Sequence, residues 1–362
     1  MKKTYYLISV FLVFSLSAYC QSKQENKDVV PLRVGIPVTP SIVYQSFGEA
    51  FQARDFRLLT VGNDNVKWFQ TELGIASFDG KTWKMQDKNR KVPTENIKDI
   101  SYDFSEYGHE LWIASPLGAT VASIPIDAKT GATTYYKDNS KILSENVLAV
   151  VAGKGSIRWF GTDKGISAFR KSDWLPVSYQ RKYPEGLFLD FPITAMATSP
   201  DGDSLYAATE GAGVSRFYRN DVDAITGASE YAPWGPIEMP SDNVYSICLA
   251  AGGKTQWFGT DKGVARHIGY KTLENWTVFT TKNGLIDNFV QSIETDRNGN
   301  VWFGTKGGVS VFDGTSWKSF TQKDGLPSNN IHCMKLDKEG VLWMGTDQGV
   351  ISFSEGKFTC FK

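Results

Sequence analysis

The sequence has few of the side chains that most often carry catalysis, bind metals or form cross-links. Its 362 residues include three histidines and four cysteines, and 39 basic and 39 acidic side chains give a formal net charge of zero. His109, His267 and His332 have no second His or Cys at the spacing of a metal site. The sequence therefore does not support a zinc centre or a histidine-activated nucleophile. The balanced charge also argues against nucleic acid as a partner.

Sustained helical periodicity is missing after residue 25, and the cysteines do not indicate a disulfide framework. Cys20 lies in the leader described below. The other three, Cys248, Cys333 and Cys360, form an odd set that cannot pair completely within the chain. We interpret them as small buried residues. No catalytic residue, metal ligand or cofactor is predicted.

The first 20 residues are typical of an export signal. Lys2 and Lys3 precede a mostly apolar run, residues 5–19, which is too short for a stable membrane span. Either a signal peptidase removes residues 1–20, or Cys20 is lipidated and begins the mature chain, as in bacterial lipoproteins. Both routes export the protein. Residues 21–47 contain no repeat and are expected to form a tether, in which residues 32–36 could add an edge strand.

An eight-residue phrase organises the remainder of the chain. Residues 302–309 read Trp-Phe-Gly-Thr-Lys-Gly-Gly-Val. Close or weaker copies begin at aromatic residues, so that successive copies start 41 to 51 positions apart: Trp68, Trp112, Trp159, Tyr206, Trp257 and Trp343. Self-similarity at this period is typical of a four-stranded propeller blade.

Each repeat contains four short extended runs separated by turn residues. In the last repeat, residues 337–340, 347–349 and 355–356 are the turns. The pattern predicts an all-β fold, a seven-bladed β-propeller of four-stranded antiparallel blades over residues 48–362. Tryptophans recur in the second and fourth runs of the repeats. We therefore expect them to pack between blades rather than to form a binding platform.

Three recurring features give the chain a resemblance to a known repeat family. They are the Trp-x-Gly-Thr-x-x-Gly-Val phrase, the Asp-x-x-Gly turn before it, as at residues 296–299, and the Gly-Leu-x-x-Asn linker between blades, as at residues 284–288. Together they resemble the two-component regulator propeller repeat over roughly residues 55–362. The resemblance implies an extracytoplasmic sensing role, and some propellers of that family are thought to recognise carbohydrate.

The first strand of each blade shows two columns. An apolar residue, as at Val290 or Ile331, is followed two positions later by a mostly small residue, with Asp99 the exception. A small residue is also expected at Gly304 of the phrase, where blades stack. The last blade ends with its own fourth strand at Phe361. We therefore expect the ring to close mainly through side-chain packing between the first and last blades.

The best candidates for a binding site lie in the loops between second and third strands. In propellers these loops share one face with the linkers between blades. We predict a ligand-binding ring of charged and amide side chains that vary between repeats: Glu72, Asp163, Lys164, Glu210, Asp261, Lys262, Lys306, Asp347 and Gln348. Mixed charge suits a polar ligand such as an oligosaccharide, or a protein surface. The alternative for any single residue is a solvated turn.

Three functions remain open. The first is a non-catalytic recognition propeller in the periplasm or at the outer membrane. Its partner would be a polar ligand or an envelope protein, and it would reach the membrane only through a lipid on Cys20. The second is a lyase, lactonase or glycosidase, which needs carboxylates converging on the channel. The third is a surface scaffold. We favour the first because no motif singles out a catalytic pair.

Overall fold

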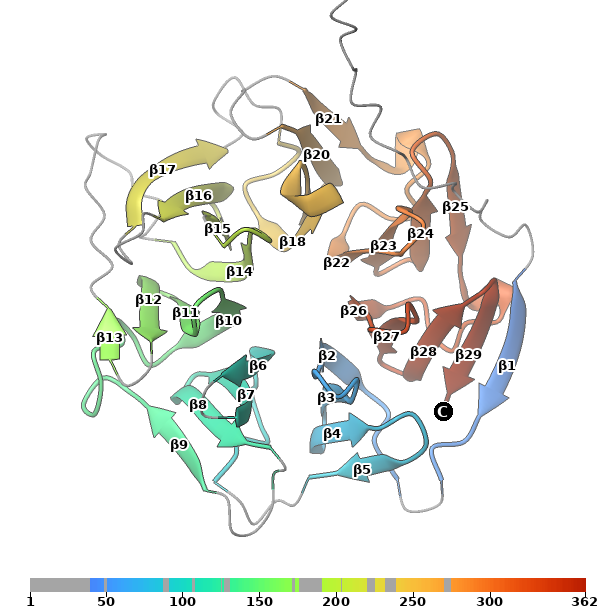
Figure 1. The fold of residues 1–362 in the computed structure, drawn as a ribbon. Helices are drawn as coiled ribbons and strands as arrows, with labels where there is room; N and C mark the ends of the chain where they lie inside the picture. Colours follow the sequence, from blue (N-terminus) through green and yellow to red (C-terminus); the bar gives the residue numbers. More distant parts are fainter. Residues whose placement is uncertain are drawn as a thin grey trace, which may run out of the picture. The chain divides into compact units, whose positions relative to one another are not determined.

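The computed structural model describes residues 40–48, 51–86, 91–105, 108–124, 126, 131–170, 173–175, 191–202, 204–219, 225–231, 239–269 and 275–362. These residues form seven small antiparallel sheets arranged as blades around a central channel (Figure 1). The only helical elements among them are three short 3-10 turns, η2 (Ala251–Gly253), η3 (Thr281–Asn283) and η4 (Gln322–Asp324). The predicted fold class is confirmed. No described helix has the length and apolar character needed to cross a membrane.

Each blade contains four consecutive strands, and the first strand is the innermost (Figure 1). In blades 1 to 4 the strands are β2 (Phe56–Val61), β3 (Lys67–Thr71), β4 (Gly74–Phe78) and β5 (Trp83–Met85); β6 (Asp99–Ser105), β7 (Gly108–Ser115), β8 (Gly118–Ser123) and β9 (Ala132–Tyr135); β10 (Val147–Gly153), β11 (Ile157–Thr162), β12 (Gly165–Arg170) and β13 (Asp173–Leu175); and β14 (Ile193–Thr198), β15 (Ser204–Thr209), β16 (Val214–Arg219) and β17 (Ile225–Tyr231).

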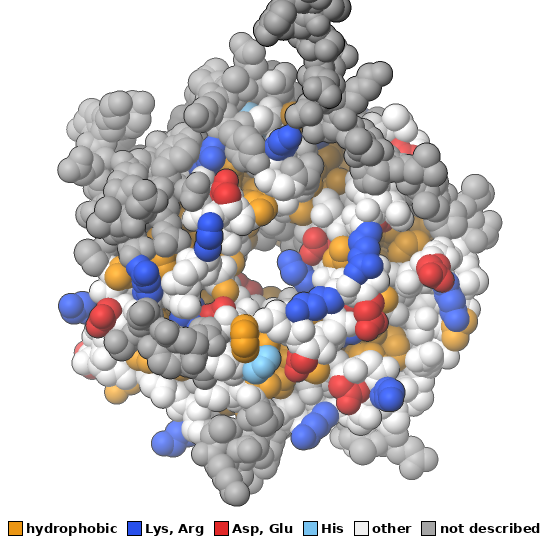
Figure 2. All heavy atoms as spheres, in the orientation of Figure 1, with side chains coloured by type: hydrophobic (Ala, Val, Ile, Leu, Met, Phe, Trp, Pro, Cys, Tyr) orange, Lys and Arg blue, Asp and Glu red, His pale blue; other side chains and the backbone are white. Residues whose placement is uncertain are grey.

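Blades 5 to 7 follow the same order. Their strands are β18 (Val244–Ala250), β19 (Thr255–Thr260), β20 (Val264–Ile268) and β21 (Trp276–Phe279); β22 (Val290–Thr295), β23 (Val301–Thr305), β24 (Val309–Phe312) and β25 (Trp317–Phe320); and β26 (Ile331–Leu336), β27 (Leu342–Thr346), β28 (Gly349–Ser354) and β29 (Lys357–Phe361). Each innermost strand contacts the innermost strands of both neighbouring blades, and β2 contacts β26, so the ring is closed. Figure 2 shows the central opening, with basic and acidic side chains spread around it.

The glycine of the repeated phrase sets the distance between blades. A Cβ atom built on Gly304 would lie 2.8 Å from Ile331 Cγ2 of the next blade, and one on Gly259 would lie 2.8 Å from Val290 Cγ1. Real Cβ atoms do not approach other atoms so closely, so a larger residue would force the blades apart. In blades 4, 6 and 7 the apolar column of the first strand therefore packs on the phrase glycine of the preceding blade, as the sequence predicted for Gly304.

The tryptophans pack between blades, as predicted. Trp257 lies edge-to-face on Phe303 of the next blade, with ring centroids 5.3 Å apart, and Trp112 packs on Phe160 of the next blade at 5.4 Å. The Asp-x-x-Gly turn holds the polar end of the phrase tryptophan. The indole Nε1 of Trp302 donates to Asp296 Oδ2 at 2.9 Å. The other oxygen, Asp296 Oδ1, accepts the backbone amides of Asn298 and Asn300, so the aspartate both closes the turn and positions the tryptophan.

Strand β1 (Ser41–Gln45) corrects the expectation for ring closure. It pairs in parallel with β29 along its whole length and forms a fifth, outermost strand of blade 7. Residues 41–47 therefore belong to the propeller rather than to the tether, and main-chain pairing closes the ring together with the side-chain packing that the sequence analysis expected to dominate. The segment Ser-Ile-Val-Tyr-Gln has β-forming residues, but no repeated phrase marks it in the sequence. The edge strand suggested at residues 32–36 lies outside the described residues.

Side-chain packing adds to this closure at the junction of blades 7 and 1. Phe47, which follows β1, lies 4.9 Å from the Trp83 ring of blade 1 and 6.3 Å from the Phe361 ring of blade 7, measured between centroids. Beneath them, Lys67 Nζ lies 2.9 Å from Asp337 Oδ2, and both side chains are almost completely buried. A buried ion pair of this kind favours one alignment of the two blades over others.

Candidate ligand-binding face

The second-to-third-strand loops and the linkers between blades share one face, which we call the rim face. Backbone hydrogen bonds join them directly. The amide of Gly263 donates to the carbonyl of Asn288 at 2.8 Å, and the amides of Gly211 and Gly213 donate to the carbonyl of Asp242. Each first strand begins on this face and ends on the opposite one. The geometric premise of the predicted ring is therefore correct.

The threonine of the phrase, not the charged residue after it, builds each of these loops. In blade 6 the Thr305 hydroxyl donates to the carbonyl of Gly308 at 2.7 Å and accepts from the amide of Gly307 at 3.1 Å. The same two bonds occur in every blade, with Ser115 in the degenerate blade 2. Because the hydroxyl satisfies the turn backbone, the neighbouring charged side chains are free to vary.

The nine predicted residues fall into two groups on the rim face. Six side chains are exposed: Glu72, Lys164, Glu210, Lys262, Lys306 and Gln348. Three are half-buried, and each has one carboxylate oxygen without a hydrogen-bond partner among the described residues: Asp163, Asp261 and Asp347. The structure places all nine on one face, but their role in ligand binding stays a prediction.

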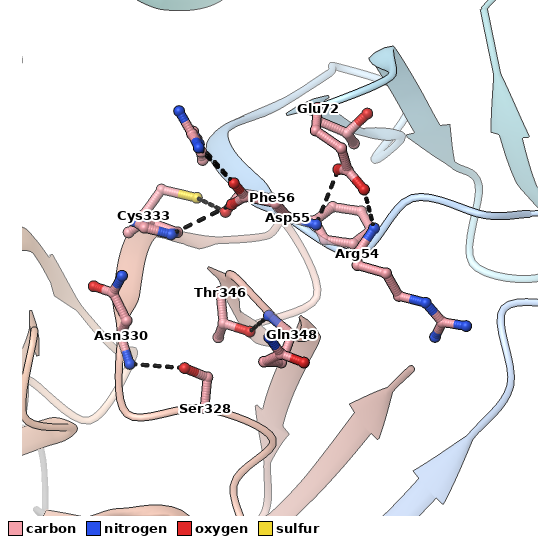
Figure 3. A network of polar contacts seen from close by, with 12 residues as sticks. Arg54, Asp55, Phe56, Glu72, Ser328, Asn330, Cys333, Thr346 and Gln348 are labelled. Atoms are coloured by element: carbon pink, nitrogen blue, oxygen red, sulfur yellow. Dashed lines mark hydrogen bonds and ion pairs between the residues drawn. The ribbon is translucent and has the colours of Figure 1, made fainter.

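Glu72 has a structural task that the sequence did not indicate. Its carboxylate accepts hydrogen bonds from the backbone amides of Arg54 and Asp55, at 2.7 Å and 2.9 Å (Figure 3). Charge-assisted bonds to two successive amides fix the chain just before β2. Glu72 therefore holds the linker that enters blade 1.

A set of residues that the sequence analysis missed lies closer to the channel. Six first strands contain a β-bulge at the same place, between the apolar column and the small column. A bulge re-aims the extra side chain. We name the bulged residues and their blade 2 equivalent the bulge ring: Arg57, Lys98, Leu148, Thr194, Tyr245, Gln291 and His332. None is buried, and no two share a residue type. The sequence signal was the variable position between two restricted columns.

Bulge-ring side chains reach over the linker of the following blade. Gln291 Nε2 donates to Asn330 Oδ1 at 2.8 Å, and the Thr194 hydroxyl donates to the carbonyl of Val244. Tyr245 stacks on Phe289 with centroids 4.9 Å apart. These contacts link blades 4, 5, 6 and 7 in turn along the inner edge of the rim face.

The rim face has a distinct aromatic sector at blades 4 to 6. Lys306 Nζ lies 3.7 Å from the centre of the Phe289 ring, which also stacks on Tyr245. Burial raises the pKa of Tyr245, and the charges of Asp261 and Glu210 raise it further. The structure thus brings three of the predicted residues, Glu210, Asp261 and Lys306, to one aromatic pair.

A second sector lies at the junction of blades 7 and 1. His332 Nε2 lies 3.4 Å from Asp55 Oδ1, and the Arg57 guanidinium lies 2.7 Å from Asp55 Oδ2. Burial lowers the pKa of His332, while the charges of Asp55 and Asp347 oppose that shift. The imidazole is therefore mainly neutral near pH 7.

Unrepeated charges also meet in the channel. Lys335 Nζ lies 3.2 Å from Glu294 Oε2, and the charge of Glu294 raises the pKa of the lysine. Asp99 is also within electrostatic reach of Lys335, and burial raises its pKa to about 7. Both Asp99 oxygens accept backbone amides, from Ile100 and from Val150 of the next blade. These carboxylates are therefore engaged by the protein. Among the described residues, no group of His, Cys, Asp and Glu is arranged to hold a metal ion.

Two stretches of the chain match the two component regulator propeller family. They are residues 284–307 and 325–348, which run from the linker through the first and second strands of blades 6 and 7. The comparison with curated proteins gave no match. The match confirms the predicted resemblance on the repeats in which the phrase, the turn and the linker are most complete.

Solved structures with the same fold include both sensor domains and enzymes. One is the extracellular domain of the hybrid two component system BT3049 from B. thetaiotaomicron. It is 18% identical to this chain with a TM-score of 0.67, and the alignment covers 86% of this chain and 41% of that domain. The corresponding domain of BT4673 is 17% identical, with a TM-score of 0.59 and coverages of 86% and 39%. The chain thus spans about two fifths of these domains.

Virginiamycin B lyase from Staphylococcus aureus is 14% identical with a TM-score of 0.58, and the alignment covers 83% of this chain and 94% of the lyase. At identities this low, the structural similarity shows a shared fold only, and function must be argued from the site.

Proposed function

We propose that the chain is a non-catalytic recognition propeller that acts outside the cytoplasm and binds a polar ligand on the rim face. The observation that carries the proposal is the bulge ring. Around it, glycine, threonine and apolar residues repeat because packing requires them, whereas the seven bulged positions hold seven different residue types. Variation on a rigid scaffold is typical of a recognition surface.

An oligosaccharide is the ligand class that the rim face suits best. Tyr245 supplies an aromatic surface with a hydroxyl, and Gln291, Thr194 and the exposed Glu210 supply hydrogen-bonding groups nearby. Mixed charge with few apolar side chains also suits the surface of an envelope protein, which is the alternative partner.

The location rests on two supports. The leader, residues 1–20, has the basic and apolar segments of an export signal. The similar B. thetaiotaomicron structures are extracellular domains. We propose a position in the periplasm or at the outer membrane, with lipidation of Cys20 as the route of attachment.

A thermal-shift screen of the full chain against neutral and acidic oligosaccharides tests the proposal. A ligand that binds the folded state raises the melting temperature by mass action, by an amount that grows with concentration above its Kd. Tyr245→Ala should remove the shift, and Phe104→Ser, at the opposite end of its first strand, should keep it. A shift that survives Tyr245→Ala would place binding elsewhere.

A lyase is the second candidate, because the lyase structures match over nearly their whole length. The rim group of His332, Asp55 and Asp347 is the best-placed set for acid–base chemistry. Incubation with streptogramin B, followed by mass spectrometry, separates the two functions. If the wild type cleaves streptogramin B and His332→Gln does not, the function is catalysis rather than recognition.

A further inference from the structure

We infer that residues 41–48 and 51–55 form a strap that couples the rim face to the outer edge of blade 7. As a route for a binding signal, the strap rests on the proposed function. As a mechanical link, it rests on contacts at its two ends and its middle. We name this segment, as far as the structure describes it, the closing strap.

The outer end of the closing strap is held by few contacts. Among the described residues, strand β1 pairs only with β29, and four of its five side chains are exposed, while Ile42 packs on the core between blades 6 and 7. The Tyr44 hydroxyl donates to the carbonyl of Gly325 at 2.6 Å, and the backbone amide of Lys362 donates to the carbonyl of Gln45 at 3.1 Å. A short edge strand with little buried surface opens at a lower free energy than the core.

The inner end of the closing strap is part of the rim face. Glu72 accepts the amides of Arg54 and Asp55, and the Asp55 carboxylate lies between Arg57 and His332. Two elements of blade 1 therefore hold two adjacent residues: the second-to-third-strand loop through Glu72 and the bulge through Arg57. His332 of blade 7 lies beside the Asp55 carboxylate without a hydrogen bond to it. Any group that binds His332 or Arg57 must act on this end of the strap.

The middle of the closing strap is packed tightly between blades 1 and 7, so that a displacement at one end is passed to the other. Phe47 and Phe51 are buried among aromatic rings of blades 1 and 7, with their own centroids 5.0 Å apart. Ala53 is completely buried. Packed aromatic clusters have discrete arrangements and do not deform continuously, so release of one end alters the other.

Hydrogen exchange on the full chain, without ligand, tests the coupling. Glu72→Ala should speed amide exchange of residues 41–45 by about tenfold or more, because two charge-assisted bonds at the inner end are lost. Glu210→Ala is the matched control, since Glu210 follows the phrase threonine in blade 4 as Glu72 does in blade 1. It should leave residues 41–45 unchanged within about twofold.

The reverse direction must also hold, because coupling between two sites is reciprocal. Tyr44→Phe, which removes only the bond to Gly325, should speed exchange at Arg54 and Asp55 and leave Gly263 unaffected. Two results would contradict coupling between the two ends of the closing strap. One is faster exchange at residues 54–55 with no change at 41–45. The other is exchange of β1 together with β27 in the wild type. Failure to find a ligand would leave this test untouched, so the two proposals fail separately.

Discussion

Two neighbouring junctions of the ring use the same repeat and are stabilised differently. At the junctions of blade 6 with 7 and of blade 7 with 1, a turn aspartate accepts the indole of its own blade, Asp296 from Trp302 and Asp337 from Trp343. The residue before the phrase tryptophan of the following blade is Leu342 at the first junction and Lys67 at the second. Only Lys67 forms an ion pair with the turn aspartate.

The difference follows from chain connectivity. A linker joins blade 6 to blade 7, whereas blades 7 and 1 are not consecutive in the chain. The ion pair, the aromatic cluster around Phe47 and strand β1 take the place of that linker. A repeat protein can therefore keep its repeat and close its ring by a few side chains at one junction.

The largest effect is expected for Asp337→Ala. The Lys67 ammonium would remain buried without a partner, and the free energy of unfolding should fall by about 3–5 kcal/mol. Urea denaturation of the full chain measures this loss. Asp296→Ala is the matched control. It removes charge-assisted hydrogen bonds from uncharged donors, leaves no buried charge without a partner, and should cost about 1–3 kcal/mol. Equal losses for the two variants would break the comparison between the junctions.

The next effect is expected for Gly304→Val at the junction of blades 6 and 7. The new side chain meets Ile331 of the next blade, so over-packing should lower the free energy of unfolding by about 1–3 kcal/mol. Gly131→Val is the control, because a Cβ atom there meets nothing within 4 Å. Thermal melting compares the two. An unchanged melting temperature for Gly304→Val would remove the packing role of the phrase glycine.

A pH effect is expected at the junction of blades 2 and 3. Asp99 stands in the small column and accepts the Val150 amide at 2.8 Å, as the Ser292 hydroxyl accepts the Met334 amide between blades 6 and 7. Its pKa is about 7 in the fold and 3.8 as a free side chain. A raised acid pKa means that the folded state binds the proton more tightly. The contribution of Asp99 to the free energy of unfolding is therefore full below pH 3.8 and is lost as the pH rises through about 7.

Asp99→Asn provides the reference for this effect. The stability of the wild type relative to Asp99→Asn should fall by about 4 kcal/mol between pH 4 and pH 8, because each pH unit between the two pKa values costs about 1.4 kcal/mol. Urea denaturation at several pH values measures the difference. A stability difference that does not vary with pH would show that Asp99 is not the titrating group.

The smallest effects on stability are expected on the rim face. Lys164→Ala and Glu210→Ala remove exposed side chains from loops that the phrase threonine already holds, so each should change the free energy of unfolding by less than about 0.5 kcal/mol. Thermal melting is sufficient to detect a larger change. Losses comparable to that of Gly304→Val would show that the loop charges belong to the scaffold.

The fold was accessible from the sequence because its determinants repeat. The phrase glycine and threonine have local tasks, a close approach and a turn, that call for a glycine in blades 3, 5, 6 and 7 and for a hydroxyl side chain in every blade. Strand β1 was missed because it occurs once, and its strand character becomes clear only beside β29. The bulge ring was missed because a bulge is defined by the partner strand, and residues such as Tyr245 and His332 have nothing in common except their place.

The central claim is that recognition lies on the rim face and that the repeat supplies the scaffold. The most direct test is calorimetric titration of the full chain with an oligosaccharide that raises its melting temperature. It should be repeated with Tyr245→Ala, with His332→Gln and with Phe104→Ser on the opposite face. The account predicts affinity losses of about tenfold or more for a rim variant that contacts the sugar, and an unchanged Kd for Phe104→Ser. Loss of affinity in Phe104→Ser alone would contradict it.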